Sequence, residues 1–303
     1  MAAINKTHWR FASQLACNLR SAICPHMAIG GVECRPLKLT TITLMKILIT
    51  GANRGIGATL VEQAAKLGHE VVALSRNLEA LTAQWQTHKN VTCDQLEVTD
   101  AAQWQQVALR HAPFDVLINV AGVLYSGQTG ELKPDEVSAM LDVNVKGTIY
   151  GTNAAAQVMK PHGFGHIINV GSTASLFPTP GTPIYATSKF AVRGFSIAAA
   201  GDLKPYGIAV TLFGPAAVKT EMLEKQRGDK NAALTFTGKR ALSPEEVAAA
   251  ILGPVLKQRP LEYFLPRSDG WLGKFSNVFP TAFLWLAARL RKKGEKNFNA
   301  KGF

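Results

Sequence analysis

Residues 50–57 read TGANRGIG and follow the apolar segment MKILI (45–49), at a position where a strand would turn into a helix. Gly51 can adopt backbone angles that other residues avoid, and Gly55 and Gly57 let a pyrophosphate and the sheet approach the backbone closely. A helix that follows would point its free N–H groups at that phosphate. Glycine turns also join strands to helices where no ligand binds, so this octapeptide alone leaves both interpretations open.

Short apolar runs rich in β-branched residues recur along the chain, and six segments of helical periodicity lie between them. The runs are KILIT (46–50), EVVAL (70–74), NVTC (90–93), DVLINV (115–120), GHIINV (165–170), IAVTLF (208–213) and LEYFLP (261–266). The helical segments are 56–67, 77–88, 100–111, 134–160, 184–203 and 243–258. In the last of these, Ser243, Pro244 and Glu246 form the pattern of a capping box. Continuous apolar strands between helices predict an α/β fold, a doubly wound parallel sheet of Rossmann-like type in a single domain.

Four further motifs follow the glycine turn in a fixed order. They are NVAG (119–122), DVNVKG with Asn144, INVGS ending at Ser172, and YATSK with Tyr185 and Lys189. Together with TGxxxGxG they resemble the short-chain dehydrogenase/reductase family over roughly residues 45–265. Two positions depart from that family's usual pattern, because Val120 replaces a second Asn and Ala216 replaces a Gly after Pro215. Neither departure removes a catalytic group, but both put the local loop geometry in doubt.

The catalytic chemistry can be argued from residue types. Tyr185 and Lys189 are four residues apart on an expected helix, so they project from one face. We expect the ammonium to lower the pKa of the phenol below its ordinary value of about 10, and the Ser172 hydroxyl to bind a substrate carbonyl. The resemblance implies that Lys189 also holds the nicotinamide ribose, that Asn144 supports a water-linked proton relay, and that Thr220 bonds the carboxamide.

The expected cofactor is NADP, used as NADPH in reduction. The second strand ends in Ser75 and Arg76 without the carboxylate that would accept from a ribose 2′-hydroxyl, and Arg54 adds a second positive charge for a 2′-phosphate. The alternative is that these arginines are exposed and have no role in binding. By resemblance, Glu97 and Val98 contact the adenine. The full expected cofactor set is Thr50, Gly51, Asn53, Arg54, Gly55, Ile56, Gly57, Ser75, Arg76, Glu97, Val98, Asn119, Ala121, Gly122, Tyr185, Lys189, Pro215, Val218 and Thr220.

The substrate is expected to be a small-molecule carbonyl or alcohol of hydrophobic character. Met222 and Leu223 lie in the segment 216–243, where the family carries its substrate lid, and Leu176 and Phe177 follow Ser172 at the same mouth. A cofactor-sensing protein on this fold remains an alternative, although such proteins commonly lose the tyrosine–lysine pair. A sugar-nucleotide epimerase or dehydratase fits less well, because its glycine turn is spaced TGxxGxxG.

The formal net charge of +12 is concentrated at the two ends of the chain. Residues 1–44 carry five Lys or Arg and one acid, and residues 269–303 carry seven and two, so the body between them is nearly balanced and nucleic-acid binding is not expected. The four cysteines match no zinc spacing, so no metal is expected, and free thiols favour a cytoplasmic location.

Three segments are therefore expected: an N-terminal extension (1–44), a catalytic domain (45–268) and an apolar, basic C-terminal extension (269–303). Residues 1–44 are either an acid-poor targeting segment or the result of a misassigned start upstream of Met45, and the second interpretation is favoured. Residues 271–293 either pack on the body or a second subunit, or lie as a helix on a membrane surface. The resemblance implies a homodimer or homotetramer formed through 134–160 and 184–203.

Overall fold

The computed structural model describes residues 43–298 and residue 303. The chain divides into Met1–Ile42, which lies outside the described residues, and Thr43–Phe303. The two interpretations of residues 1–44 therefore stay predictions.

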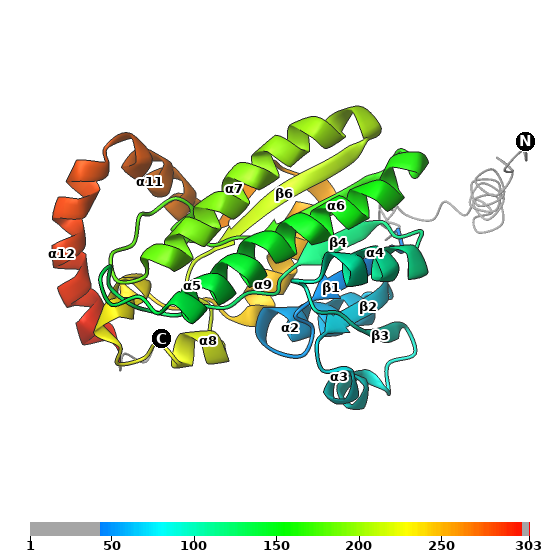
Figure 1. Ribbon diagram of the computed structural model, residues 1–303, viewed down its shortest axis with the longest axis horizontal. Helices are drawn as coiled ribbons and strands as arrows, with labels where there is room; N and C mark the ends of the chain where they lie inside the picture. Colours follow the sequence, from blue (N-terminus) through cyan, green and yellow to red (C-terminus); the bar gives the residue numbers. More distant parts are fainter. Residues whose placement is uncertain (1–42, 299–302) are drawn as a thin grey trace, which may run out of the picture. The chain divides into compact units, whose positions relative to one another are not determined.

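A seven-stranded sheet, parallel throughout, forms the centre of Thr43–Phe303 (Figure 1). Its strand order is β3-β2-β1-β4-β5-β6-β7. The strands are β1 (Lys46–Thr50), β2 (Glu70–Ser75), β3 (Val91–Gln95), β4 (Val116–Asn119), β5 (Gly165–Val170), β6 (Ile208–Pro215) and β7 (Glu262–Leu265). All seven runs that the sequence offered as strands are in this sheet, and the predicted α/β fold is confirmed.

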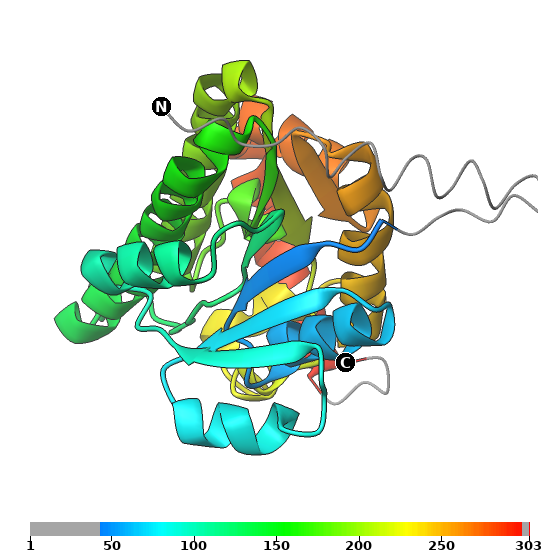
Figure 2. The same ribbon diagram turned by 90° about the vertical axis from the view of Figure 1, so that its right-hand side faces the viewer.

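Helices cover both faces of the sheet, with α2 and α9 on one side and α4, α6 and α7 on the other (Figure 2). The helices are α2 (Gly55–Lys66), α3 (Leu78–Trp85), α4 (Ala101–Arg110), α5 (Pro134–Leu141), α6 (Gly147–Met159), α7 (Pro183–Leu203), α8 (Glu221–Glu224), α9 (Pro244–Ala250), α10 (Leu256–Gln258), α11 (Arg267–Val278) and α12 (Pro280–Asn297). Short 3-10 segments are η2 (Lys160–His162), η3 (Thr173–Ser175), η4 (Lys204–Tyr206) and η5 (Lys230–Phe236).

The two faces of β1 show why its central residues are all apolar. Successive side chains of a strand point to opposite faces. Ile47 and Ile49 pack in the core beneath α2 and α9, whereas Leu48 packs in the core beneath α4 and α6. All three side chains are at most 1% exposed. A parallel sheet covered on both faces therefore leaves no position on its central strands for a solvated residue.

Two predicted helices are interrupted by single π-helical turns. The expected helix 134–160 is divided by η1 (Asp142–Lys146), and the expected helix 243–258 is divided by η6 (Ile251–Val255). Pro254, which lacks the N–H that an α-helix would use, lies inside η6. Hydrophobic periodicity does not register one extra residue in a turn, so both segments looked continuous. The predicted capping box at the start of α9 is confirmed.

The strand order reverses direction between β1 and β4, and this switch point is where open α/β sheets bind ligands. Thr50, at the carboxyl end of β1, joins the two strands there. Its hydroxyl oxygen accepts hydrogen bonds from the backbone N–H of Val120 at 2.9 Å and of Ala121 at 3.1 Å. The glycine turn and the loop after β4 are thus held side by side at the carboxyl edge of the sheet.

The turn between β1 and α2 is closed by the approach of Gly57 to Gly51. A Cβ atom on Gly57 would overlap the carbonyl oxygen of Gly51, and Gly51 itself has φ +65°. The backbone of Ala121 lies 3.2 Å from the position that a Cβ on Gly51 would take. Larger residues at either glycine would force the turn away from the sheet.

Gly57→Ala is expected to lower the free energy of unfolding by about 2 kcal/mol, because the added methyl group can only be accommodated by opening the turn. Gly201→Ala is a matched control, since a Cβ at that helical glycine meets nothing within 4 Å. That control should leave stability unchanged or raise it by about 0.5 kcal/mol. Urea denaturation of both variants measures the difference, and equal stabilities would contradict this reading of the turn.

Candidate active site

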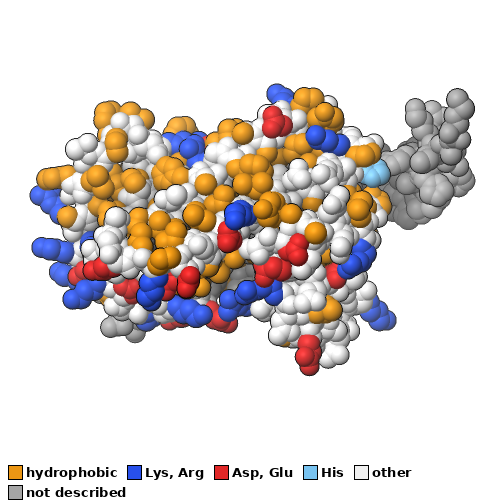
Figure 3. Space-filling model, in the orientation of Figure 1, with side chains coloured by type: hydrophobic (Ala, Val, Ile, Leu, Met, Phe, Trp, Pro, Cys, Tyr) orange, Lys and Arg blue, Asp and Glu red, His pale blue; other side chains and the backbone are white. Residues whose placement is uncertain are grey.

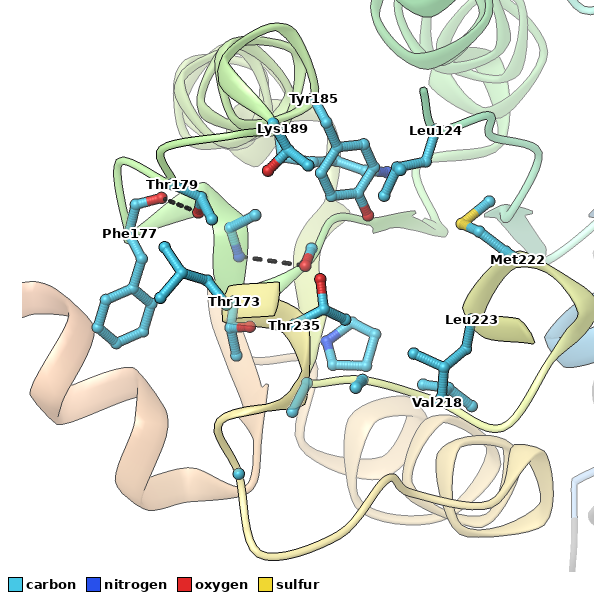
Figure 4. A pocket seen from close by; sticks show the side chains of 18 of the residues that line it. Leu124, Thr173, Phe177, Thr179, Tyr185, Lys189, Val218, Met222, Leu223 and Thr235 are labelled. Carbon is cyan, nitrogen blue, oxygen red and sulfur yellow. Dashed lines mark hydrogen bonds between the residues drawn. The ribbon is translucent and has the colours of Figure 1, made fainter. Parts of the chain in front are cut away.

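A cavity of about 440 Å³ opens at the carboxyl edge of the sheet (Figure 4). Residues expected for catalysis and for cofactor binding line the same space, although they are up to 164 positions apart in the sequence. Those that line it are Ile56, Gly122, Ser172, Tyr185, Lys189, Pro215, Val218 and Thr220. Of the remaining predicted residues, Asn144 lies on η1, and the others lie in the glycine turn, at or just after the ends of β2 and β4, and in the loop after β3.

Tyr185 and Lys189 project from one face of α7, as their spacing predicts. The ring of Tyr185 points into the space between α7 and the segment that carries Met222 (Figure 4). The Nζ atom of Lys189 lies 5.6 Å from the centre of that ring and donates a hydrogen bond to the carbonyl of Val170 at 3.1 Å. The whole Lys189 residue is only 5% exposed, so its ammonium lies almost entirely inside the protein.

The expected fall in the phenol pKa is wrong for this structure. Burial raises the pKa of Tyr185 to about 12, and a hydrogen bond with Ser172 offsets that rise only in part. Burial also lowers the pKa of Lys189 to about 8. Removal from water penalises both charged forms, and the lysine is directed to a backbone carbonyl instead of the phenolic oxygen. At neutral pH Tyr185 therefore carries its proton and Lys189 is still mainly charged.

Ser172 lies immediately after β5 and caps η3. Its side-chain oxygen accepts from the backbone N–H of Ala174 at 3.1 Å, and its backbone N–H donates to the hydroxyl of Ser175 at 3.3 Å. This reciprocal pair fixes the serine at the edge of the cavity. A hydroxyl that bonds the phenol of Tyr185 is also placed to bond a carbonyl beside that phenol.

Asn144 lies on the π-helical turn η1 and is 1% exposed. Its Oδ1 atom accepts from the N–H of Val123 at 2.8 Å, and its Nδ2 atom donates to the carbonyl of Val123 at 2.9 Å and to the hydroxyl of Ser188 at 3.1 Å. The amide thus ties the loop after β4 to α7. Both N–H groups of the amide and one lone pair of Oδ1 are used in these hydrogen bonds. The role of Asn144 in a proton relay stays a prediction.

A buried polar network beneath the cavity was missed from the sequence. Asn169, inside the apolar run GHIINV, accepts from the amide of Asn119 at 2.9 Å and donates to the hydroxyl of Ser196 at 3.0 Å. Thr152 adds a further hydrogen bond to Asn169 at 3.3 Å. The signal was available, because an amide in the middle of a buried strand must find partners.

The predicted phosphate cradle has open donors. Helix α2 starts at Gly55, and no side chain caps its first N–H groups. A helix start of this kind attracts anions because its unpaired N–H groups carry a partial positive charge. The Thr220 methyl group lies 3.2 Å from the position of a Cβ on Gly55, so the segment after β6 meets the glycine turn across the cavity. Asn53 in the turn is exposed.

Both predicted arginines lie near carboxylates. Arg54 forms an ion pair with Glu221 of α8 at 3.0 Å, and Arg76 lies 3.9 Å from Glu97. Arg76 follows Ser75 at the end of β2, and its side chain is 71% exposed, which leaves it free to turn toward a ligand. Glu97, one of the two predicted adenine contacts, lies beside Arg76. Its carboxylate accepts hydrogen bonds from the backbone N–H and the hydroxyl of Thr99.

Two smaller predictions concern the loops. Val98 is 8% exposed and packs against Gly147 at the start of α6, which leaves its adenine contact a prediction. Val120, where the family usually has Asn, packs against the core beneath α2 and α9. Ala216 donates its N–H to the carbonyl of Leu265 at 2.8 Å. Both residues at which the chain departs from the family pattern also line the cavity.

The outer part of the cavity is mainly apolar. Phe177 contacts Phe283 of α12, with ring centres 5.5 Å apart. The other apolar side chains there are Leu124, Met222, Leu223, Leu234, Leu272, Leu290 and Phe303. Phe177, Met222 and Leu223 line the mouth as expected, whereas Leu176 is fully buried beneath α11 and does not reach the cavity. Helices α11 and α12 add a wall that the sequence did not predict.

Two charged side chains in this outer part bear on specificity. Arg240 is held by Glu246, with one pair of atoms 2.7 Å apart, and that ion pair contributes most to lowering the pKa of Glu246 to about 2. Asp269 also lines the cavity. Among the described lining residues the only other cation is Lys189, at the inner end.

Within the described chain no group of three or more His, Cys, Asp or Glu is placed to hold a metal ion.

Replacing Lys189 with Met tests the burial of the ammonium. Lysine titrates near 10.5 when solvated and at about 8 in this fold, so the unfolded chain binds more protons between these values and stability rises with pH. The wild-type free energy of unfolding should gain about 2–3 kcal/mol over Lys189→Met from about pH 8 to about pH 10.

Below about pH 8 both states keep the lysine proton, so the wild-type and Lys189→Met curves should run parallel there. The raised pKa of Tyr185 acts in the opposite direction, but only above about pH 10. Denaturant unfolding at a series of pH values gives both curves. A difference that stays constant across the whole range would show that the ammonium is solvated.

Comparison with known proteins agrees with this geometry. A family model described as short chain dehydrogenase matches residues 45–231. The NADP-dependent 3-hydroxy acid dehydrogenase YdfG of Salmonella typhi is 30% identical over 223 residues, covering 68% of this chain and 87% of that protein. The closed form of serine dehydrogenase complexed with NADP+ is 31% identical with a TM-score of 0.63, covering 68% of this chain and 87% of that one.

A further solved structure is a short-chain dehydrogenase from Sphingobium yanoikuyae in complex with NADPH. It is 28% identical with a TM-score of 0.66, and the match covers 78% of this chain and 96% of that one. The glycine turn, Ser172, Tyr185 and Lys189 all lie inside the matched residues 45–231. This chain is a member of the short-chain dehydrogenase family and an oxidoreductase.

Proposed function

We propose that this enzyme uses NADPH to reduce a hydrophobic ketone or aldehyde to an alcohol. The observation that carries the proposal is one cavity whose inner end holds Ser172, Tyr185 and Lys189 and whose outer part is lined by Phe, Leu and Met side chains. An apolar lining with a few polar groups at one end orients a carbonyl and excludes water from it.

The chain's own residues supply the acid chemistry of the reduction. The Ser172 hydroxyl donates a hydrogen bond to the carbonyl oxygen, and the Tyr185 phenol gives that oxygen its proton. The raised pKa of Tyr185 keeps this proton in place at neutral pH, which suits reduction. The ammonium of Lys189 lies 5.6 Å from the centre of the Tyr185 ring and, without bonding the phenolic oxygen directly, supplies positive charge near the phenolate that forms. NADPH, when bound, supplies the hydride that reaches the carbonyl carbon.

NADP fits the residues at the end of β2. Ser75 and Arg76 stand where an NAD enzyme would place a carboxylate, and Arg76 is free to form paired hydrogen bonds with a 2′-phosphate. The first N–H groups of α2 suit the pyrophosphate. Three relatives point the same way, because the named 3-hydroxy acid dehydrogenase is NADP-dependent and both solved structures hold NADP or NADPH.

The outer cavity favours a hydrophobic carbonyl over the hydroxy acids of the named relatives. A carboxylate substrate needs a free cation to bind it, yet Glu246 occupies the guanidinium of Arg240. Asp269 would repel such a substrate at the same mouth. An uncharged apolar chain meets no such penalty beside Phe177 and Phe283.

Oligomerisation and location stay proposals. The outward face of α7 carries the small exposed residues Ala191, Gly194 and Ala198, which would let a helix of a second subunit approach closely in a homodimer or homotetramer. A cytoplasmic location rests on the expected free thiols. Peripheral contact with a membrane is supported by the outward face of α11 and α12.

Turnover distinguishes this enzyme from a cofactor-sensing protein. NADPH consumption should be seen with aromatic, steroidal or fatty carbonyls, and Tyr185→Phe should lower kcat/KM by about 100-fold or more because the proton donor is lost. Tyr206→Phe is a matched control, since this exposed tyrosine precedes β6 at the opposite edge of the sheet.

Two results would count against the proposal. NADPH binding without turnover of any carbonyl would favour a sensor. Faster turnover of serine or 3-hydroxy acids than of hydrophobic alcohols, measured in the oxidative direction, would assign the chain a substrate like those of its named relatives.

Arg76→Asp tests the cofactor assignment. A carboxylate at that position repels a 2′-phosphate but can accept from a ribose hydroxyl, so KM for NADPH should rise about 100-fold while KM for NADH changes little or falls. Lys89→Asp makes the same change in net charge at the amino edge of β3 and should leave both KM values unchanged. Equal effects of Arg76→Asp on the two cofactors would defeat the assignment.

A further inference from the structure

Helices α11 and α12 form a hairpin that lies beyond the residues matched by the family model. Its inner face is closely packed on the body. A Cβ on Gly273 would lie 2.6 Å from the side chain of Leu176, and a Cβ on Gly294 would overlap the backbone of Ala233 in η5. Ser276 and Ala287 are buried on the same face.

Hydrogen bonds fix the hairpin in this position. Asn277 donates to the carbonyl of Leu176 at 2.8 Å, Lys293 to the carbonyl of Thr237 at 3.0 Å, and Asn297 to the carbonyl of Phe236 at 2.9 Å. The inner face thus has its partners in the described chain. The outer face is not needed for packing on the body.

That outer face is nevertheless apolar and aromatic. Trp271 is 79% exposed, Phe275 61% and Trp285 65%. The other exposed apolar side chains of the hairpin are Val278, Phe279, Leu284 and Leu286, and Leu272 is exposed at the mouth of the cavity. Figure 3 shows orange side chains at the left, in the region where Figure 1 labels α11 and α12. A group of large exposed apolar side chains on two neighbouring helices, the apolar patch, marks a contact surface in a folded protein.

Cations flank the apolar patch. Residues 267–297 contain seven Lys or Arg and only two acids, Asp269 and Glu295. Glu295 lies 3.8 Å from Arg291, and Arg289 stacks over the ring of Trp285 at 4.0 Å. The exposed side chains of Lys292 and Lys296 extend this charge along α12. Exposed tryptophan beside a row of cations is the pattern of helices that lie in the headgroup region of a bilayer.

We propose that the outer face of the α11–α12 hairpin docks on a bilayer surface that carries anionic lipids. Its aromatic side chains would enter the boundary between headgroups and acyl chains, while its lysines and arginines would meet the negative headgroups. No helix in the described part of the chain is long and apolar enough to cross a membrane.

A second copy of the chain fits this face less well. A two-fold contact places the same patch of each subunit against the other. The cations of one hairpin would then face those of its partner, with two acids on each to balance them. An anionic lipid surface is complementary to the whole patch.

The same hairpin lines the substrate cavity. Leu272, Phe283 and Leu290 come from α11 and α12 and face the space that holds Tyr185. A docked hairpin therefore brings the mouth of the cavity close to the lipid boundary, where hydrophobic carbonyls would be concentrated. This last step rests on the proposed substrate class, whereas the docking itself does not.

Vesicle sedimentation of the full chain tests the proposal. Vesicles of phosphatidylcholine with phosphatidylserine should pellet the protein, and pure phosphatidylcholine should pellet much less. Trp271→Glu with Phe275→Glu should lower the partition coefficient about tenfold or more, and Lys292→Glu with Lys296→Glu should remove the preference for phosphatidylserine. Leu109→Glu, on a residue that is 64% exposed on α4, is the matched control and should bind as the wild type does.

Equal binding by the wild type and the Trp271→Glu/Phe275→Glu variant, or no binding by the wild type, would overturn the docking. Size-exclusion chromatography tests whether a second copy of the chain covers the face instead. A wild type that is dimeric and does not bind vesicles, together with a monomeric Trp271→Glu/Phe275→Glu variant, would assign the face to a second copy. Turnover of a water-soluble carbonyl without lipid should be unchanged in all variants. Vesicle binding by a protein that turns over no carbonyl would sustain the docking and reject the proposed function.

Discussion

The close approach of the Gly57 backbone to the carbonyl of Gly51 is the constraint on which the site depends. It lets α2 start directly above the end of β1, with its first N–H groups open to a ligand. Thr50 then carries this placement across the switch point, because its hydroxyl holds the loop after β4. The loop in turn is tied to α7 by Asn144. Cofactor cradle and catalytic helix are thus linked through backbone contacts and two polar side chains.

The buried pair on α7 shows how far sequence spacing can specify chemistry. Spacing correctly placed Tyr185 and Lys189 on one face, but it could not tell how much water each would lose. In the structure burial is the main cause of both pKa shifts, so the phenol is harder to ionise and the ammonium easier to neutralise. The charge of Lys189 is instead stabilised by the carbonyl of Val170. Such a balance depends on three-dimensional surroundings that no local motif contains.

The sheet was predictable because strands such as β1 have apolar central residues, Ile47, Leu48 and Ile49, on both faces, as a doubly covered parallel sheet requires. The capping box at Ser243 was predictable because Ser243, Pro244 and Glu246 form a pattern that is local in the sequence. The π-helical turns were not, since one added residue changes no periodicity. The network around Asn169 was predictable only in part: a buried amide must find partners, but the sequence could not identify them as Asn119 and Ser196, which are distant along the chain.

The sequence of the α11–α12 hairpin serves two purposes, packing on the body through one face and exposing aromatic side chains on the other. Small residues such as Gly273 and Gly294 recur among the aromatics because the body approaches the helix backbone there. The aromatics on the opposite face cannot be explained by that packing. Folding on the body would be satisfied equally well if Trp271 and Trp285 were polar, so their exposure costs solubility without adding to the core. The outer face of the hairpin, apolar beside a row of cations, is therefore explained by contact with a partner of that chemistry and not by folding of the chain.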